Sequence, residues 1–257
     1  MTYCVGLRLE DGLVLLSDTR TNAGVDNIST FNKMHVVEAP GDRLVCLMTA
    51  GNLSLSQIVV NMVQEGFASE TLDGTFSLAT TGSMFATAQL VGEAIRKAFA
   101  AHGAAMRAQN IGFDVSMLLA GQIRGRRMRL FQIYSAGNFI EATEETPFLQ
   151  IGEHKYGKPI LDRAARYDTP LYDAIKLVLV SMDSTLRSNL SVGLPIDLLV
   201  YRRDTCRVDI RRRIGADDPY FRQISEQWSS ALRDAYRAIP RPDWAPPAID
   251  PARGASS

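Results

Sequence analysis

The chain is poor in the residues that build disulfide frameworks and metal sites. Its three cysteines lie far apart and show no Cys-x-x-Cys spacing (Cys4, Cys46 and Cys206). Its three histidines are equally scattered along the 257 residues. An odd, sparse set of this kind argues against a disulfide scaffold or a zinc site. We therefore expect no metal and no cofactor.

An excess of charge and a long apolar run are also missing. Lys and Arg together number 28, as do Asp and Glu, so the formal net charge is zero. This balance favours neither nucleic acid nor a membrane surface as a partner, whereas a nearly neutral protein tends to associate with itself. No segment reaches the roughly eighteen apolar residues of a membrane span, and charges interrupt the first twenty residues where a signal peptide would lie. The sequence predicts a cytoplasmic protein.

The apolar patterning predicts an α+β protein. Tyr3–Leu9 and Leu13–Asp18 are strand-like and flank a Glu-Asp-Gly turn, so they form a hairpin that places Thr2 and Asp18 at adjoining strand ends. Further strands are expected at 34–38, 43–49, 113–120, 126–135, 147–152, 196–203 and 206–213, and helices at 53–67, 84–101, 159–166 and 170–187. Residues 19–31 predict a loop or irregular pair, and 71–83 predict a break. Hairpins with helices in blocks indicate two sheets face to face with helix pairs outside them.

The carboxy-terminal segment differs from the rest of the chain. Residues 217–239 predict an amphipathic helix, and the proline-rich tail 240–257 predicts extended or disordered chain. The helix carries apolar residues at helical spacing: Tyr220, Phe221, Ile224, Trp228, Leu232 and Tyr236. Such a face either forms an interface or packs on its own subunit. We expect a domain over residues 1–213 and an extension over residues 214–257.

Thr2 follows the initiator Met1, and removal of Met1 would make it the amino terminus. One residue would then hold a hydroxyl nucleophile and a free α-amine. Because the ordinary pKa of an α-amine is about 7.7–8.0, much of it is neutral near pH 7 and can act as a general base. A small residue behind Met1 is also common without any such role, so Thr2 alone decides little.

Asp18, Lys33 and Gly51 supply what such a nucleophile needs. Lys33 can favour the neutral amine and stabilise developing charge on the Thr2 hydroxyl, while Asp18 keeps Lys33 charged and oriented. The Gly51 backbone N–H is a natural oxyanion donor, because glycine lets a substrate approach the main chain closely. Taken together in this register, the residues favour a catalytic interpretation over separate structural roles.

This register resembles the opening of a proteasome β-type subunit. The residues that carry the resemblance are Thr2, Asp18-Thr19-Arg20-Thr21-Asn22-Ala23-Gly24, Lys33, Ala50-Gly51, Ser191-Val192-Gly193 and Asp197. The short start and the long carboxy-terminal extension are most similar to the Anbu family, a bacterial proteasome-like group. The resemblance implies the four-layer αββα sandwich of amino-terminal-nucleophile hydrolases, a threonine-type peptidase activity on peptides or unfolded proteins, and assembly of identical subunits into a ring or an open helix.

Three positions depart from the family pattern. Ser188 stands where the family commonly has Asp, three residues before Ser191, and Glu153 stands where it often has Ser. Ser188, Ser191 and Glu153 are therefore expected near the Thr2 amine as supporting residues. Asn22 replaces a Thr or Ser that contacts the substrate backbone, yet still offers a donor and an acceptor. These changes predict weak or narrow peptidase activity.

Two other functions stay open at this point. The chain could be a silent subunit that only assembles, although proteasome α-type subunits have a helix before the first strand and this chain has no room for one. It could also be an amidase on the same fold, although such enzymes more often begin with Cys or Ser. The sequence does not identify the substrate or an ATPase partner.

Overall fold

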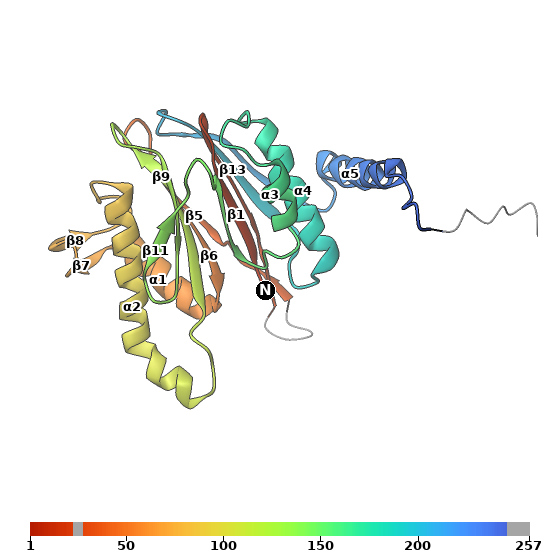
Figure 1. Cartoon of the computed structure of the whole chain (residues 1–257). Helices are drawn as coiled ribbons and strands as arrows, with labels where there is room; N and C mark the ends of the chain where they lie inside the picture. The colour runs from red at the N-terminus through yellow and green to blue at the C-terminus, as the bar shows by residue number, and fades with distance from the viewer. Residues whose placement is uncertain (23–27, 246–257) are drawn as a thin grey trace, which may run out of the picture.

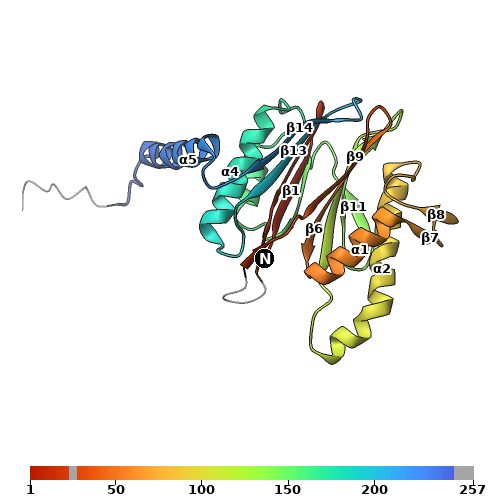
Figure 2. The same cartoon turned by 180° about the vertical axis from the view of Figure 1, so that it is seen from behind.

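Two five-stranded antiparallel sheets lie face to face in the computed structural model, which describes residues 1–22 and 28–245 (Figures 1 and 2). The first sheet has the order β12-β1-β2-β13-β14: Phe148–Gly152, Tyr3–Arg8, Gly12–Asp18, Ile196–Arg202 and Val208–Ile214. The second has the order β11-β10-β9-β6-β5: Phe139–Glu141, Arg129–Ile133, Val115–Ile123, Arg43–Gly51 and Met34–Ala39.

Helices cover the outer face of each sheet. The helices α3 (Lys158–Ala164) and α4 (Asp173–Ser188) lie on the first sheet. The helices α1 (Leu53–Glu65) and α2 (Met84–Ala108) lie on the second (Figures 1 and 2). This arrangement confirms the predicted four-layer αββα sandwich.

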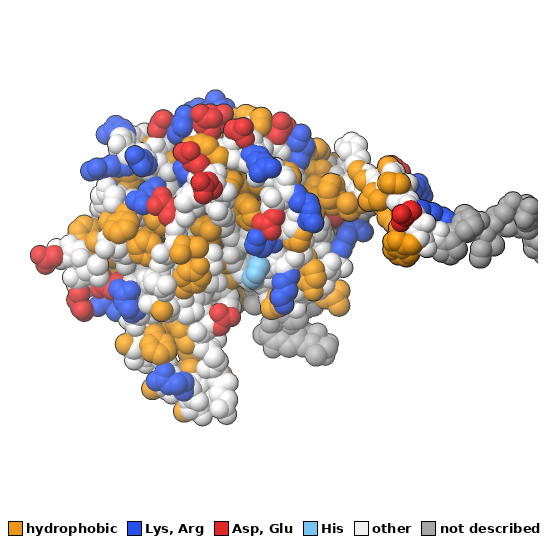
Figure 3. Space-filling view, in the orientation of Figure 1, with side chains coloured by type: hydrophobic (Ala, Val, Ile, Leu, Met, Phe, Trp, Pro, Cys, Tyr) orange, Lys and Arg blue, Asp and Glu red, His pale blue; other side chains and the backbone are white. Residues whose placement is uncertain are grey.

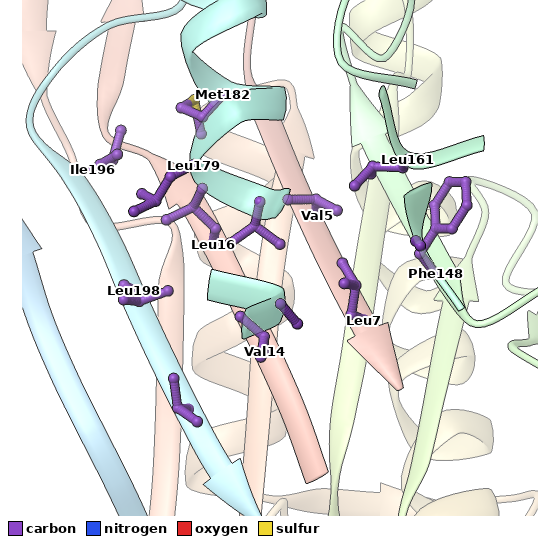
Figure 4. Close-up of a cluster of buried hydrophobic side chains, with 14 of the residues drawn as sticks. Val5, Leu7, Val14, Leu16, Phe148, Leu161, Leu179, Met182, Ile196 and Leu198 are labelled. Atoms are coloured by element: carbon purple, nitrogen blue, oxygen red, sulfur yellow. The ribbon is translucent and has the colours of Figure 1, made fainter. Parts of the chain in front are cut away.

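Alternation along the strands builds three apolar layers. In β1, Val5 and Leu7 point to α4, whereas Cys4 points to the space between the sheets, because successive side chains of a strand face opposite ways. In the layer under α4, Leu16 of β2 and Ile196 of β13 pack with Leu179 and Met182 of the helix (Figure 4). The hairpin of β1 and β2, expected from the sequence, is thus buried on both faces and fixed in register.

Several element boundaries differ from the sequence-based expectation. Helix α2 continues to Ala108 instead of ending at residue 101, because the Gly/Ala-rich segment is rich in alanine, the best helix former. Helix α1 ends at Glu65, before a hairpin of β7 (Phe67–Ser69) and β8 (Gly74–Phe76) that the sequence analysis treated as part of the helix end and a break. Strand β11 was not predicted at all. The expected irregular pair is present as β3 (Arg20–Asn22) and β4 (Ile28–Thr30).

Helix α5 (Pro219–Ala238) extends away from the body (Figure 1). It begins at Asp218, whose carboxylate accepts a hydrogen bond from the Phe221 N–H at 2.9 Å, as an N-cap does. Phe221 and Ile224 are buried against the apolar layer of α4, so the first half packs on its own subunit. The second half of α5 is open to solvent: Leu232 and Tyr236 are 50% and 76% exposed. Residues 246–257 of the predicted extended tail lie outside the described residues.

The surface of the sandwich carries charges of both signs. Acidic and basic side chains are interspersed over the face in Figure 3, as expected for a chain without net charge. Among the residues that the structure describes, no helix is long and apolar enough to cross a membrane.

Candidate active site

Thr2 lies at the start of β1, where the chain enters the first sheet. Its side chain is nearly covered, with the residue 8% exposed, while Met1 before it is 61% exposed. The Thr2 carbonyl accepts a hydrogen bond from the Glu153 N–H at 2.7 Å. Gly152 allows this contact: its φ is +80°, and a Cβ there would lie 1.9 Å from the Thr2 carbonyl oxygen. The end of β12 therefore fixes the position of Thr2.

Asp18 and Lys33 form a buried ion pair beside Thr2. The Lys33 ammonium donates to the Asp18 Oδ1 at 2.8 Å and to the Arg20 carbonyl at 2.6 Å. Asp18 also accepts from the N–H groups of Tyr3 at 3.0 Å and Gly193 at 3.4 Å. Because buried charges are stable only when they are paired and hydrogen-bonded, this set of donors explains how two charges persist between the sheets.

Electrostatics at the pair follow from its burial. Asp18 is 0% and Lys33 4% exposed. Burial raises the pKa of the Asp18 carboxyl, and the charge and hydrogen bond of Lys33 counteract that rise, as do the N–H groups of Tyr3 and Gly193. The carboxylate therefore depends on Lys33 for its charged state, and the two groups act as one unit.

Gly51 closes the site from the second sheet. It is the last residue of β6, its φ is +103°, and a Cβ would lie 2.2 Å from the Asp114 carbonyl oxygen, so only glycine fits. A cavity of about 560 Å³ lies next to Gly51. Its lining includes three predicted site residues, Thr2, Lys33 and Gly51, together with Gly152, Thr21, Ser56 and Asp114 among others. The structure thus brings together Thr2, Lys33 and Gly51 around one space, with Asp18 behind Lys33.

A second cavity of about 650 Å³ meets the first. It shares Ala50, Gly51, Asp114 and Gly152 with the cavity at Thr2 and continues along β12 to α3. Its far part is lined by polar and charged side chains that include His154, Lys158 and Asp162. Thr2 lines the first cavity and is not among the residues that line the second.

The predicted supporting residues differ from one another in burial and in hydrogen bonds. Ser188 ends α4 and is exposed, and Ser191 is half-buried in the loop that follows. Among the described residues, no hydrogen bond joins either hydroxyl to Thr2. Glu153 is buried next to Thr2 and accepts a hydrogen bond from the Asn189 amide at 3.1 Å, whereas the exposed Lys155 forms no ion pair with it in this part of the chain. The side chain of Asn22 lies outside what the structure describes.

Three contributors were missed by the sequence analysis. The Tyr3 N–H binds Asp18, but any residue could supply a backbone donor, so no signal marks it. Thr21 and Ser56 line the cavity, and the hydroxyl oxygens of both are buried without a hydrogen-bond partner in the described chain. Buried polar groups are rarely left unpaired, so these hydroxyls are suited to a ligand or water. Their residue types alone, which are common on any strand or helix, could not have shown this.

No metal site stands out in the described ranges, 1–22 and 28–245. No group of three or more His, Cys, Asp or Glu side chains lies close enough together there to hold a metal ion. The three cysteines are buried and free.

Comparison with known proteins fits this geometry. A family model described as the proteasome subunit matches residues 2–200. A structure of Anbu from Hyphomicrobium sp. strain MC1 is 53% identical, with a TM-score of 0.82, and the match covers 94% of this chain and 99% of that one. Anbu from Yersinia bercovieri is 45% identical with a TM-score of 0.85, covering 95% and 100%. A helical assembly of the Anbu complex from Pseudomonas aeruginosa is 46% identical with a TM-score of 0.86, covering 94% and 98%. No match was found among curated proteins.

The fold and the matched residues define the class of protein: the chain belongs to the proteasome-subunit family and has the amino-terminal-nucleophile hydrolase fold. Within this family it belongs to the Anbu group, since it resembles Anbu structures from several bacteria over nearly its whole length. The resemblance drawn from the sequence is thereby confirmed.

Proposed function

We propose that this chain is a threonine-type peptidase subunit in which Thr2, freed by removal of Met1, is the nucleophile. One observation carries the proposal. The buried Lys33–Asp18 pair and Gly51 surround Thr2 at the edge of a cavity of about 560 Å³. A charged pair buried between two sheets costs free energy, and a site of this composition uses that charge for chemistry.

Each residue has a role in the proposed reaction. The free α-amine of Thr2, directly or through a water, accepts the proton of the Thr2 hydroxyl as the oxygen attacks a carbonyl. The Lys33 ammonium stabilises the negative charge that develops on that oxygen, and Asp18 orients it through their 2.8 Å contact. The Gly51 N–H stabilises the oxyanion of the tetrahedral intermediate. As the intermediate collapses, the scissile C–N bond breaks, the protonated Thr2 amine gives its proton to the leaving amine, and the acyl-enzyme remains. Water then hydrolyses the acyl-enzyme, with the amine again moving the proton.

The two cavities support an extended peptide as the substrate. Because both cavities have Gly51 and Gly152 in their walls, we propose that a chain whose carbonyl lies at Thr2 extends from the first cavity toward the second. Asn22 at the end of β3 is proposed to bind the substrate backbone, and Thr21 beside it lines the cavity at Thr2. An amidase acting on a small molecule would need only one of the two cavities. The proposed setting is intracellular breakdown of peptides or unfolded proteins in the cytoplasm.

Hydrolysis by the Met1-free protein tests the proposal. Protein with and without Met1, verified by intact mass, is incubated with a library of peptides of about ten residues. We expect cleavage only without Met1, and none in Thr2→Ala. Cleavage by Thr2→Ala at the wild-type rate would refute the peptidase proposal. No cleavage by any form, in a protein that still assembles, would favour the silent subunit instead, and release of small amides alone would favour the amidase.

We also propose that identical subunits assemble, and that α5 contributes. The Anbu complex from Pseudomonas aeruginosa forms a helical assembly. In the present chain the second half of α5 leaves Leu232, Tyr236 and, just beyond, Ile239 in solvent. Large exposed apolar side chains in a row favour an interface. Deleting residues 226–257 keeps the packed first turns, and we expect a folded protein of lower mass by light scattering. A truncated protein with its full multimeric mass would refute the role of α5.

A further inference from the structure

The loop between α4 and β13, residues 189–195, contacts three segments near Thr2: the end of β2, the start of β3 and the residue after β12. The Gly193 N–H donates to Asp18 at 3.4 Å, and the Leu190 carbonyl accepts from the Arg20 guanidinium at 2.9 Å. The Pro195 carbonyl accepts from the Thr19 hydroxyl at 2.6 Å. Asp18 to Arg20 are thus held by one short loop. The loop therefore helps to hold Asp18, together with the pairing of β2 with β13 and the N–H of Tyr3.

Asn189 begins this loop and ties it to the other side of the site. Its Nδ2 donates to the Glu153 Oε2 at 3.1 Å, and its Oδ1 accepts from the Ser191 N–H at 2.9 Å. Its backbone N–H remains bonded to the Thr185 carbonyl in α4 at 2.9 Å, so the residue is anchored to the helix. Both ends of the Asn189 amide are therefore engaged, one by each partner.

Glu153 connects Asn189 to Thr2. Its N–H binds the Thr2 carbonyl at 2.7 Å, and its side chain is buried with the residue 5% exposed. Among the described residues its carboxylate forms no ion pair, and Asn189 is the side chain that holds it. Loss of the hydrogen bond from Asn189 would leave the buried Glu153 carboxylate without a partner, which costs free energy.

We propose that Asn189 is a positioning residue of the active site. Through its two hydrogen bonds it couples the backbone N–H that holds Thr2 to the loop whose N–H holds Asp18. Thr2 precedes β1 and Asp18 ends β2, two strands that pair directly, and Asn189 adds a second link between these two ends from outside the sheet. The inference rests on the proposed function for its chemistry, and on the hydrogen bonds alone for its geometry.

Exchanging the hydrogen-bond donor and acceptor between Asn189 and Glu153 tests this proposal. In Asn189→Asp the Oδ1 contact to Ser191 can persist, but a carboxylate faces Glu153. In the double variant Asn189→Asp with Glu153→Gln, the Gln amide donates to the new Asp, so the bond is restored with its direction reversed and the net charge is unchanged. Glu153→Gln alone keeps an acceptor for Asn189. Arg187→Gln is the matched control, because Arg187 lies two residues away and binds Asp183 and Ser225 instead.

The first measurement is the rate at which a β-lactone probe acylates Thr2 in the Met1-free, full-length protein, followed by intact mass. We expect Asn189→Asp to lower the saturating rate about 10-fold, a common coupling for residues in contact, with little change in the half-saturating probe concentration. The double variant should return to within about 3-fold of the wild type. Arg187→Gln should match the wild type. A folded Asn189→Asp protein that reacts at the wild-type rate would overturn the proposal.

A second measurement separates this inference from the peptidase proposal. Competitive acetylation of the Thr2 α-amine by acetic anhydride, across pH, reports the amine without any attack by its hydroxyl. The other charged groups around Thr2, namely Asp18, Lys33 and Asp114, are the same in every variant. The added carboxylate in Asn189→Asp should raise the labelling midpoint, and the double variant should restore it. If wild-type protein resists the lactone, the peptidase proposal fails while this shift still tests the tie. A midpoint unchanged in Asn189→Asp would count against it.

Folding of the variants is checked by thermal unfolding. If Asn189→Asp does not fold, Asn189→Ala removes the same bonds without adding a charge, and it should slow acylation while Arg187→Gln does not. Recovery of fold and rate in the double variant would also support the tie. A double variant that folds but reacts no faster than Asn189→Ala would overturn it.

Discussion

Polar side chains are buried at both ends of the space between the sheets, and the two clusters differ in one respect. At the far end from Thr2, the Gln122 amide donates to the Arg126 carbonyl at 2.8 Å and to Asp204 at 2.6 Å. Its oxygen accepts from the Tyr201 hydroxyl at 2.5 Å and from the Asp204 N–H at 2.9 Å. Every donor and acceptor of this amide is occupied by the protein itself.

The cluster at Thr2 is left incomplete. The Asp18–Lys33 pair is satisfied, but Thr21 and Ser56, which line the cavity, have buried hydroxyls without a partner in the described chain. The comparison shows that burial of polar groups does not identify a site by itself. Unpaired hydroxyls on residues that line a cavity, next to a charged pair, are the better indicator, because buried polar groups are rarely left unpaired.

The largest expected effect is at the charged pair. Lys33→Met should lower the rate of Thr2 acylation on the order of 100–1000-fold, the usual loss for one preorganised electrostatic group. It also leaves Asp18 buried without its cation, which destabilises the fold. The double variant Asp18→Asn with Lys33→Met removes both charges and is the control for folding. Recovery of stability without recovery of rate would locate the role of Lys33 in the chemistry, whereas a folded Lys33→Met protein of wild-type rate would refute it.

The opposite end should show the reverse behaviour. Tyr201→Phe removes the hydroxyl that donates to Gln122 and accepts from the Cys206 N–H at 3.3 Å. We expect the free energy of unfolding, measured in urea, to fall by about 1–3 kcal/mol, the range for a lost buried hydrogen bond. The rate of acylation at Thr2 should not change. A large loss of rate with unchanged stability would mean that the two ends are coupled.

Glu93 is another buried carboxylate, and its surroundings differ from those of Asp18. Burial alone would raise the pKa of Glu93, but hydrogen bonds from the Ser69 hydroxyl and the N–H groups of Glu70 and Thr71 outweigh it and lower that pKa to about 2. A carboxyl with a lowered pKa in the folded state stabilises the protein above its ordinary pKa. That stabilisation is lost as the pH falls from about 4.5 toward about 2.

The effect of Glu93→Gln on stability therefore depends on pH. At pH 7 the free energy of unfolding should fall by roughly 2–3 kcal/mol, and the difference from the wild type should shrink between pH 4.5 and pH 2. Acid unfolding followed by circular dichroism measures both. A difference that is constant over this range would show that the ionised carboxylate is not what holds the β7–β8 hairpin to α2.

Much of this molecule could be predicted from its sequence, and the failures have a physical pattern. The hairpin of β1 and β2 and the register of Thr2, Asp18 and Lys33 were predicted because burial on both faces leaves long apolar strands. The extent of α2 was wrong because one glycine in an alanine-rich segment does not end a helix. The short hairpin of β7 and β8 depends on Glu93, which is distant in sequence.

Within the site, charged residues were easier to predict than the contacts that hold them. Asp18 and Lys33 follow a recognisable spacing, and their 2.8 Å contact agrees with it. The Tyr3 and Gly193 N–H groups and the Asn189 amide carry no such signal, since they act through backbone position and loop geometry. Ser188 and Ser191 were expected close to the nucleophile, and their roles stay predictions.

The most direct test of the account is to locate the covalent adduct of an electrophilic probe. Met1-free protein is treated with a β-lactone, and peptide mass spectrometry maps the modified residue, with Met1-retaining protein and Thr2→Ala treated in parallel. We predict one adduct, on the Thr2 hydroxyl, in the Met1-free wild type only. An adduct of equal yield in Met1-retaining protein, or on another residue in Thr2→Ala, would contradict the claim that Thr2 acts as an amino-terminal nucleophile.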